Sequence, residues 1–281
     1  MPFAVNKGVR LHWQERGIGT PVVLVMGHRY SSAMWYPVLD ALAAEHRVIW
    51  FDNRGTGDSD TVTGFTVEDM VQDVLTVMDA AGAAEAHIFG VSMGGGIVLD
   101  LGVHFPERAL SVILGCTLIL TPDKPRTPAW VRALYFLPPF VLKQLIRSKV
   151  ANQGYGSAAK AEAISRDQAM MAKDPFSVRG VHTQAGAIAG YSLTLDEAAK
   201  LSVPALVMHG DEDGTVPYAG GVELAKTLGV ELITLEGAGH NYLVARTEKS
   251  LAAIKAFVDR VDAGGPIASA ARAGADFPDA R

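Results

Sequence analysis

Residues 86–96, AHIFGVSMGGG, decide the fold of this chain. A short apolar run leads into Gly-Val-Ser-Met-Gly at residues 90–94, and an apolar stretch that can form a helix follows. Gly-x-Ser-x-Gly between a strand and a helix makes a turn so tight that the serine backbone is strained and its hydroxyl is exposed. Both flanking positions are glycine because a side chain there would collide with the turn. An ordinary turn could carry the same letters, but the flanking strand and helix and the additional Gly95 favour Ser92 as a nucleophile.

The composition is that of an ordinary globular chain. Its 281 residues are 49% hydrophobic and 20% charged, and the formal net charge is −5. This charge gives no reason to expect a nucleic-acid partner, and no apolar run reaches the ~18 residues that a membrane span needs. The start, MPFAVNKGVR, lacks the apolar core of a signal peptide, and a single cysteine, Cys116, excludes an internal disulfide. We expect a cytoplasmic protein without a nucleic-acid or membrane partner.

Short apolar runs alternate with helical periods along most of the chain. The apolar runs occupy residues 21–26, 47–51, 86–91, 110–114, 205–208 and 231–235. Runs of this kind are typical of strands that are covered on both faces. Helical spacing of apolar residues predicts helices over residues 34–44, 66–81 and 247–261. The alternation predicts a mostly parallel sheet with helices on both faces, preceded by a hairpin over residues 3–15.

The alternation stops between residues 118 and 200. This stretch has five prolines before residue 140 and contains helical patterns without strands. About 80 residues are too many for a plain loop, so we predict a helical lid inserted after the sixth strand. Residues 1–117 and 201–262 then form the core domain. Residues 263–281 are rich in Ala, Gly, Pro and Asp, and we expect a disordered tail.

Two later loops offer the partners that a serine nucleophile needs, namely a base and a residue that orients the base. Residues 206–217, LVMHGDEDGTVP, read as a strand that runs into an acidic loop. Residues 235–240, LEGAGH, end a strand and lead to one histidine. Ser92, Asp213 and His240 follow each other in the chain order of a serine triad, each just beyond a predicted strand.

These motifs together resemble the α/β-hydrolase superfamily, from about residue 9 to residue 260. Residues 51–59, FDNRGTGDS, resemble the Asp-x-Arg-Gly-x-Gly-x-Ser loop of esterase-, lactonase- and peroxidase-like members. Residues 210–217 resemble the family's acid loop, Gly-x-x-Asp-x-x-x-Pro, which implies Asp213 as the acid and leaves Asp211 as the substitute. Gly239-His240 is similar to the family's Gly-His at the base. Among the members, enol-lactonases of aromatic degradation and related small esterases are the most similar.

The resemblance also implies an oxyanion hole. Family members often carry His-Gly after the third strand, where this chain has Met26-Gly27-His28. By this position the backbone N–H of His28 would join that of Met93 at the oxyanion, and Gly27 would let the backbone approach the substrate. The imidazole of His28 either lines the pocket or belongs to a plain loop histidine, and the sequence leaves both readings open.

The predicted lid supplies candidate pocket residues. An aromatic-rich cluster would roof an apolar pocket, although packing inside the lid explains part of it equally well; its members include Trp130, Leu134, Phe136 and Phe140. Arg132, Lys143 and Arg147 could attract a substrate carboxylate. The last two also fit the solvated outer face of a helix, and we favour that simpler explanation.

The motifs predict hydrolysis of a carboxylic ester or lactone through an acyl-enzyme, with Ser92 as nucleophile, His240 as base and Asp213 as the orienting acid. This mechanism requires no cofactor. No metal is expected, because the acidic loop lacks the number and spacing of oxygens of a calcium loop and no other metal-binding spacing appears. His209 and Arg54 are expected to be structural, Arg54 by tying its glycine loop to backbone carbonyls. A carbon–carbon bond hydrolase and a cofactor-free perhydrolase would keep the same triad. A non-catalytic ligand receptor is a more distant alternative.

Overall fold

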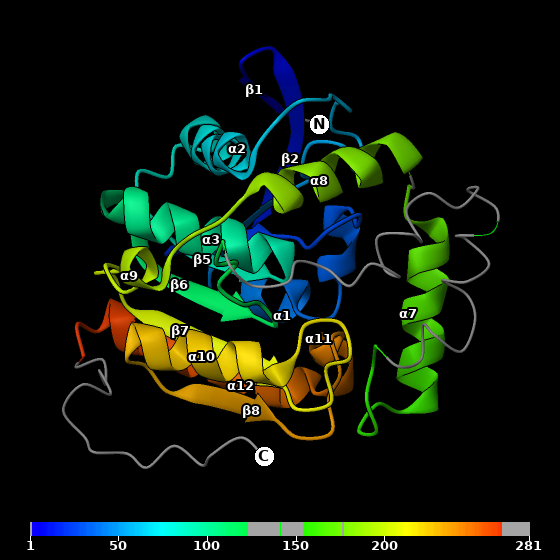
Figure 1. Ribbon diagram of the computed structural model, residues 1–281, viewed down its shortest axis with the longest axis vertical. Helices are drawn as coiled ribbons and strands as arrows, with labels where there is room; N and C mark the ends of the chain where they lie inside the picture. The colour runs from blue at the N-terminus through cyan, green and yellow to red at the C-terminus, as the bar shows by residue number, and fades with distance from the viewer. Residues whose placement is uncertain (1, 123–140, 142–153, 176, 266–281) are drawn as a thin grey trace.

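The computed structural model describes residues 2–122, 141, 154–175 and 177–265. Eight strands form one sheet in the order β1-β2-β4-β3-β5-β6-β7-β8 (Figure 1). The strands are β1 (Phe3–Asn6), β2 (Val9–Arg16), β3 (Pro21–Val25), β4 (Arg47–Phe51), β5 (Ala86–Val91), β6 (Ala109–Gly115), β7 (Ala205–Gly210) and β8 (Leu232–Leu235). The β1–β2 and β2–β4 pairs are antiparallel, and the other pairs are parallel. The predicted mostly parallel sheet is therefore confirmed.

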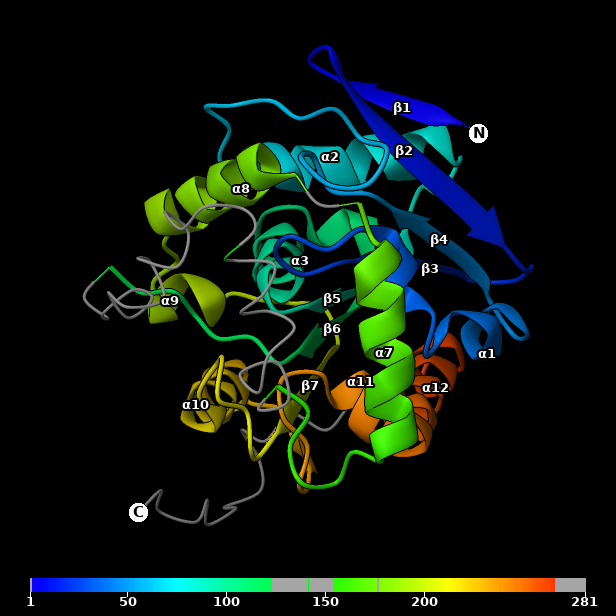
Figure 2. The same cartoon turned by 90° about the vertical axis from the view of Figure 1, so that its right-hand side faces the viewer.

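Helices cover both faces of this sheet, with α1 and α12 on one face and α2, α3 and α10 on the other (Figure 2). The helices of these two layers are α1 (Leu39–Ala43), α2 (Val67–Ala80), α3 (Met93–His104), α10 (Tyr218–Leu228) and α12 (Thr247–Asp262). Short helices η1 (Ser32–Trp35), η2 (Pro106–Arg108) and α11 (Tyr242–Ala245) lie in the connections. Strand β3 shows why the apolar runs are continuous: Val23 and Val25 face one helical layer, whereas Val22 and Leu24 face the other.

Local sequence signals set the bounds of α2. The hydroxyl of Thr66 accepts a hydrogen bond from the backbone of Asp69, and the Asp69 carboxylate accepts one from the backbone of Thr66. This reciprocal capping box satisfies two donors that the first turn would otherwise leave unpaired. Gly82 follows the helix with a φ of 66°, which glycine adopts without strain. The helix predicted over residues 66–81 is confirmed.

The helix predicted over residues 34–44 is wrong in extent. The chain instead forms η1, then a turn, and α1 begins only at Leu39. Pro37 lies between the two pieces, and proline has no N–H to continue a helical ladder. Helix α12 agrees closely with its prediction and ends at Asp262, where the core was expected to end.

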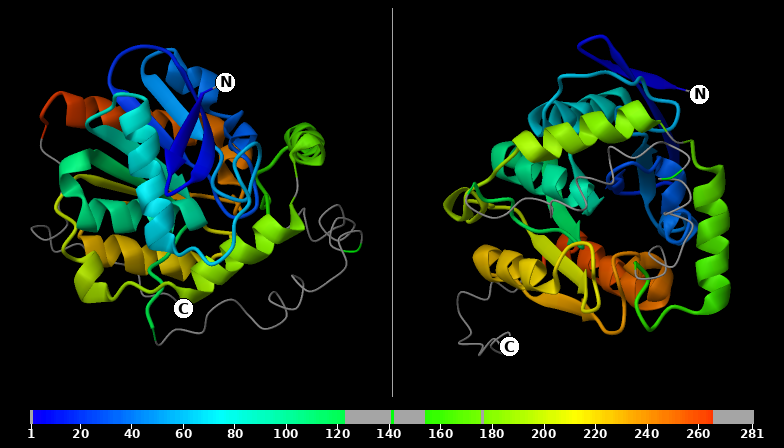
Figure 3. Two further views of the ribbon diagram at one scale, coloured as in Figure 1. Left: turned by 90° about the horizontal axis from the view of Figure 1, so that it is seen from above. Right: turned by 45° about the vertical axis from the view of Figure 1, so that its right-hand side comes forward.

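Between β6 and β7 the described residues form α7 (Ala161–Lys173), α8 (Val178–Gly190) and α9 (Leu195–Ala198), and no strand. Figure 3 shows α7 and α8 outside the two helical layers, and Figure 1 shows α7 beyond the carboxyl ends of the parallel strands. We call residues 118–200 the helical insertion; its action as a lid stays a prediction. The expected pocket residues Trp130, Leu134, Phe136 and Phe140 lie outside the described residues, as do Arg132, Lys143, Arg147 and the tail from residue 266 onward.

Candidate active site

Ser92 lies in a strained turn between β5 and α3. Its φ of 55° and ψ of −120° are uncommon for a residue with a side chain. The backbone N–H of Ser92 donates to the carbonyl of Gly115 at the end of β6, with N and O 2.8 Å apart. The neighbouring strand therefore fixes the strained residue, as the nucleophile prediction requires.

The glycines around Ser92 are required by close backbone contacts. A Cβ atom at Gly90 would lie 2.2 Å from the carbonyl oxygen of Gly94, and one at Gly94 would lie 2.1 Å from that of Val25. A Cβ at Gly27 would lie 3.2 Å from the Cβ of Ser92 and 3.9 Å from its Oγ. Gly27 therefore lies directly against Ser92, where the sequence predicted that the backbone approaches the substrate.

Asp213 and His240 meet in the loops that follow β7 and β8. The Nδ1 atom of His240 lies 2.7 Å from Oδ2 of the buried Asp213. Nδ1 must be the donor because an ionised carboxylate only accepts, so neutral His240 keeps Nε2 free of a proton. The other carboxylate oxygen of Asp213 accepts the backbone N–H groups of Thr215 (2.8 Å) and Val216 (2.9 Å). This arrangement lets Asp213 orient His240 as a base.

The pKa of Asp213 lies well below its usual value. Burial alone would raise this pKa, but hydrogen bonds from His209 and His240, the charge of His240 and the Val216 amide together lower it. The carboxylate therefore stays ionised wherever the protein is folded near neutral pH.

His209 is a second histidine on the same carboxylate. It is fully buried, and its Nε2 lies 3.0 Å from the carbonyl oxygen of Val216 and 3.3 Å from Oδ2 of Asp213. The sequence predicted a hydrogen-bonded structural histidine here, and these contacts agree with that role. The contact with Asp213 was not predicted.

Asp211 does not compete for His240. Its Oδ1 accepts the backbone N–H of Gly237 at 2.6 Å, and its side chain lies in an exposed part of the loop. The contact joins the acid loop to the loop that carries the base. The geometry therefore favours Asp213 over Asp211 as the acid.

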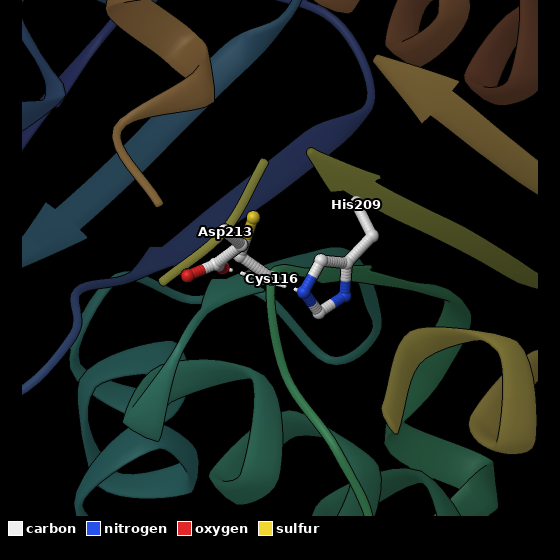
Figure 4. A group of neighbouring side chains, drawn as sticks. All are labelled: Cys116, His209 and Asp213. Carbon is white, nitrogen blue, oxygen red and sulfur yellow. Dashed lines mark ion pairs between the residues drawn. The ribbon is translucent and has the colours of Figure 1, made fainter. Parts of the chain in front are cut away.

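Figure 4 shows the side chains of Cys116, the residue after β6, and His209, from β7, next to that of Asp213. Their ligating atoms lie within 4.8 Å of one another, which is close enough for a shared metal ion. Burial, followed by the charge of Asp213, raises the pKa of the Cys116 thiol well above its usual value. A metal binds the thiolate form of cysteine, so a metal ion here would have to displace the proton of this thiol. Cys116 and His209 thus lie beside Asp213, and Nε2 of His209 is 3.3 Å from its Oδ2.

The loop after β3 carries His28, and its imidazole contacts the helical insertion. Nε2 of His28 lies 2.9 Å from the carbonyl oxygen of Val181 in α8, so Nε2 carries the proton and donates. Burial lowers the pKa of His28 to about 4; the Val181 bond raises it, and Arg29 and His182 lower it further. Met93 is the first residue of α3, where backbone N–H groups have no partner within the helix. The backbone N–H groups of His28 and Met93, predicted for an oxyanion hole, thus directly follow Gly27 and Ser92 in the chain.

Arg54 is structural, but its main partner differs from the prediction. Its guanidinium forms two contacts of 2.5 and 2.6 Å with the carboxylate of Asp73 in α2, and both side chains are buried. A backbone carbonyl, that of Asp69, is a more distant partner at 3.4 Å. The expectation of carbonyl partners was therefore wrong in the main contact, because only the tertiary packing of α2 brings Asp73 to this loop.

Two buried polar residues of the insertion were not singled out from the sequence. Asp167 in α7 accepts the hydroxyl groups of Tyr36 (2.8 Å) and Tyr155 (2.7 Å). Gln184 in α8 bonds to the backbones of Arg29 and Arg54. Neither residue belongs to a motif. The only sequence signal that could have identified them is a polar residue on the apolar face of a predicted helix.

The family described as the alpha/beta hydrolase fold matches residues 20–245, and this chain belongs to that family. The α/β-hydrolase fold and the class of α/β-fold hydrolases, which the motifs predicted, are confirmed. None of the described helices is long and apolar enough to cross a membrane.

Individual relatives carry several hydrolase names. RutD of Azorhizobium caulinodans, named a carbamate hydrolase, is 37% identical over 115 residues, which cover 41% of this chain and 43% of RutD. The match therefore spans less than half the length of this relative. The enol-lactonase structure from Burkholderia xenovorans has a TM-score of 0.76 and 26% identity, covering 92% of this chain and 100% of that one. A thermophilic esterase from Thermogutta terrifontis has a TM-score of 0.78 and 25% identity, covering 92% and 98%.

Proposed function

We propose that this protein hydrolyses a carboxylic ester or lactone through an acyl-enzyme on Ser92. The observation that carries the proposal is the 2.7 Å hydrogen bond between Asp213 and His240, together with the strained turn at Ser92. The parallel strands β5, β7 and β8 end at the same edge of the sheet, so the loops that follow them converge there. A nucleophile, a base and an orienting acid are the groups that acyl transfer needs.

In this mechanism the Oγ of Ser92 attacks the carbonyl carbon, and Nε2 of His240 takes the hydroxyl proton. The negative charge moves to the carbonyl oxygen, where the N–H groups of Met93 and His28 stabilise it. Collapse of the tetrahedral intermediate breaks the ester C–O bond, and His240 gives the proton to the leaving alcohol. Water then attacks the acyl-serine by the same steps and releases the acid. With a lactone the alcohol and the acid are parts of one product.

The names of similar proteins support this class of substrate. An enol-lactonase and an esterase cover almost the whole chain at 25–26% identity. Carbamate hydrolysis is a second candidate, since the relative named for it is 37% identical over 115 residues. All three reactions transfer an acyl or carbamoyl group to a nucleophile. A carbon–carbon bond hydrolase and a perhydrolase would use the same three side chains and need a substrate panel to be distinguished.

A single set of assays tests the proposal. A fluorophosphonate probe should modify Ser92 of the full chain, and tandem mass spectrometry of a digest should locate the adduct on that serine. Turnover should then appear in a panel of nitrophenyl esters of increasing acyl length, enol-lactones and carbamates. A chain that is neither labelled nor active on the panel would indicate the non-catalytic receptor. Labelling at Ser92 with turnover of carbamates alone would select the second candidate.

A further inference from the structure

The loop that follows β3 is held by a glutamine of the insertion. Gln184 lies in α8, and its side chain is fully buried. Its Oε1 accepts the backbone N–H of Arg29 at 2.8 Å, and its Nε2 donates to the backbone carbonyl of Arg54 at 2.9 Å. One amide therefore joins the loop after β3 to the loop after β4, and both of its ends are used.

The backbone of Arg29 is strained and is held by contacts with other residues. Its φ of 73° lies in the left-handed region, which residues other than glycine adopt at a cost. Such a conformation persists where the surroundings fix it. The hydrogen bond to Gln184 engages the backbone N–H of this strained residue, so Gln184 helps to hold it.

Gln184 does not act alone on this side of the sheet. A Cβ at Gly180 would lie 1.9 Å from the carbonyl oxygen of Gly55, so the backbones of α8 and the second loop touch. One residue later, the Val181 carbonyl accepts a hydrogen bond from Nε2 of the His28 imidazole. Residues 180, 181 and 184 lie on one face of a helix. This face of α8 therefore meets both loops within a single turn.

The two peptide planes that flank the Gly27–His28 peptide are fixed. The carbonyl of Met26 accepts the Nδ2 group of the buried Asn53 at 2.8 Å, which fixes the plane before Gly27. Gln184 fixes the plane between His28 and Arg29. The backbone N–H of His28 lies between these two planes, so its direction depends on both. Gly27, which adjoins Ser92, has no side chain that could limit its own rotation.

We propose that Gln184 is a positioning residue that aims the backbone N–H of His28 at the oxyanion. The inference rests on the proposed hydrolysis, in which this N–H is one of two oxyanion donors. Gln184 has no part in binding the reacting atoms and acts only through the loop. Its loss should therefore weaken the interaction with the tetrahedral state more than the interaction with the substrate.

Gln184→Leu tests this, because leucine has a similar size and makes neither hydrogen bond. Removal of an entire oxyanion donor costs about 10²- to 10³-fold in kcat, so a misdirected donor should cost about 10- to 100-fold. KM should change by no more than about threefold, because ground-state binding is retained. The inhibition constant of a trifluoromethyl ketone, which mimics the tetrahedral state, should rise by a factor similar to the loss in kcat. A merely structural loss would lower the number of active molecules and leave that inhibition constant unchanged.

Two further variants complete the test. Gln184→Met has a side chain of similar length without a hydrogen-bonding amide, so it should reproduce the loss in kcat and the rise in the inhibition constant, and it replaces Gln184→Leu if that variant does not fold. Tyr191→Phe is the matched control, since Tyr191 is a buried residue at the end of α8 that bonds to Asp100 in the core at 2.8 Å. This control should change the melting temperature without raising the inhibition constant.

The outcomes separate this inference from the proposed function. If wild-type protein is labelled and active, but Gln184→Leu keeps its kcat and its inhibition constant within about twofold, the positioning role is wrong and the hydrolase stands. If wild-type protein is inactive and unlabelled, the proposed function itself fails.

Discussion

The turn around Ser92 and the loops that carry Asp213 and His240 are held in different ways. The turn is fixed by its own strand and helix, by the close backbone contacts of Gly90 and Gly94, and by one hydrogen bond to Gly115 of the neighbouring strand. The acid and base loops are fixed by the insertion. The carbonyl of Tyr155 accepts the N–H of Gly239 at 2.9 Å, and the backbone and hydroxyl of Ser157 both donate to Glu212 at 2.6 Å.

Helix α7 extends this second arrangement. Asp167 holds Tyr155, whose backbone contacts the base loop, and Tyr36, which belongs to the segment after η1. Asn241, next to His240, donates its backbone N–H to the carbonyl of Gly154 at 2.7 Å. The turn that carries Ser92, the proposed nucleophile, is thus fixed by neighbouring elements, whereas the loop of His240, the proposed base, contacts residues about 70 to 90 positions earlier in the chain. A substitution that displaces the insertion should therefore disturb the position of His240 more than the geometry of Ser92.

The largest expected effect is at the turn that carries Ser92. Ser92→Ala removes the nucleophile and should lower kcat by about 10⁶-fold, as the loss of a triad serine does elsewhere. The fold should persist, because alanine meets the same contacts with a smaller side chain. Steady-state kinetics and circular dichroism check both points. Activity within about tenfold of wild type would overturn the mechanism.

Asp213→Asn should have the next largest effect. Asparagine cannot accept the Nδ1 proton of His240 as a carboxylate does, so the imidazole loses its orientation and kcat should fall by about 10⁴-fold. Asp211→Asn is the matched control in the same loop and should cost little. Since the pKa of Asp213 is held below its usual value, activity lost on acidification should reflect protonation of the base and not of this acid. The reverse ranking of the two variants would make Asp211 the acid.

Asp167→Asn tests whether the insertion positions the base. The change leaves the charge and geometry at Ser92 unaltered but replaces one of the two oxygens that accept the hydroxyl groups of Tyr36 and Tyr155 with an amide group, which cannot accept. A displacement of about 1 Å in catalytic groups can cost 10²-fold, so kcat should fall by about 10- to 100-fold. Asp100→Asn is the control, because Asp100 is also buried and bonded to a tyrosine of the insertion, Tyr191. Equal losses of kcat in the two variants would mean that general docking of the insertion, and not the base loop, is what matters.

The smallest expected effect concerns the hydrogen bond of the His28 imidazole to Val181 in α8. Its pKa of about 4 in the folded protein lies below the ordinary value of 6.5, so the unfolded chain takes up this proton first as the pH falls. The folding stability from this group is therefore present above about pH 6.5 and is lost progressively toward pH 4. His28→Gln should make the fall in melting temperature over this range shallower by a few degrees, as measured by calorimetry. Identical pH profiles for the variant and the wild type would contradict the assignment.

The sequence by itself determined the features that local sterics and periodicity control. Continuous apolar runs predicted strands covered on both faces, and Thr66, Asp69 and Gly82 set the ends of α2. Gly-x-Ser-x-Gly predicted the strained turn because the collisions at Gly90 and Gly94 arise within that turn and its nearest strand. Pro37 was also a local signal, and it would have corrected the helix predicted over residues 34–44.

Only the tertiary structure decided which distant side chains pair. Nothing near Arg54 in the sequence points to Asp73, 19 residues later, as its carboxylate. Asp167 and Gln184 are polar residues within helices, and only packing reveals that their partners lie in the loops of the core. Such pairs depend on how separate elements dock, and a buried polar group takes whichever partner the docking brings within hydrogen-bond distance. The spacing of residues along the chain therefore does not predict which partner such a group has.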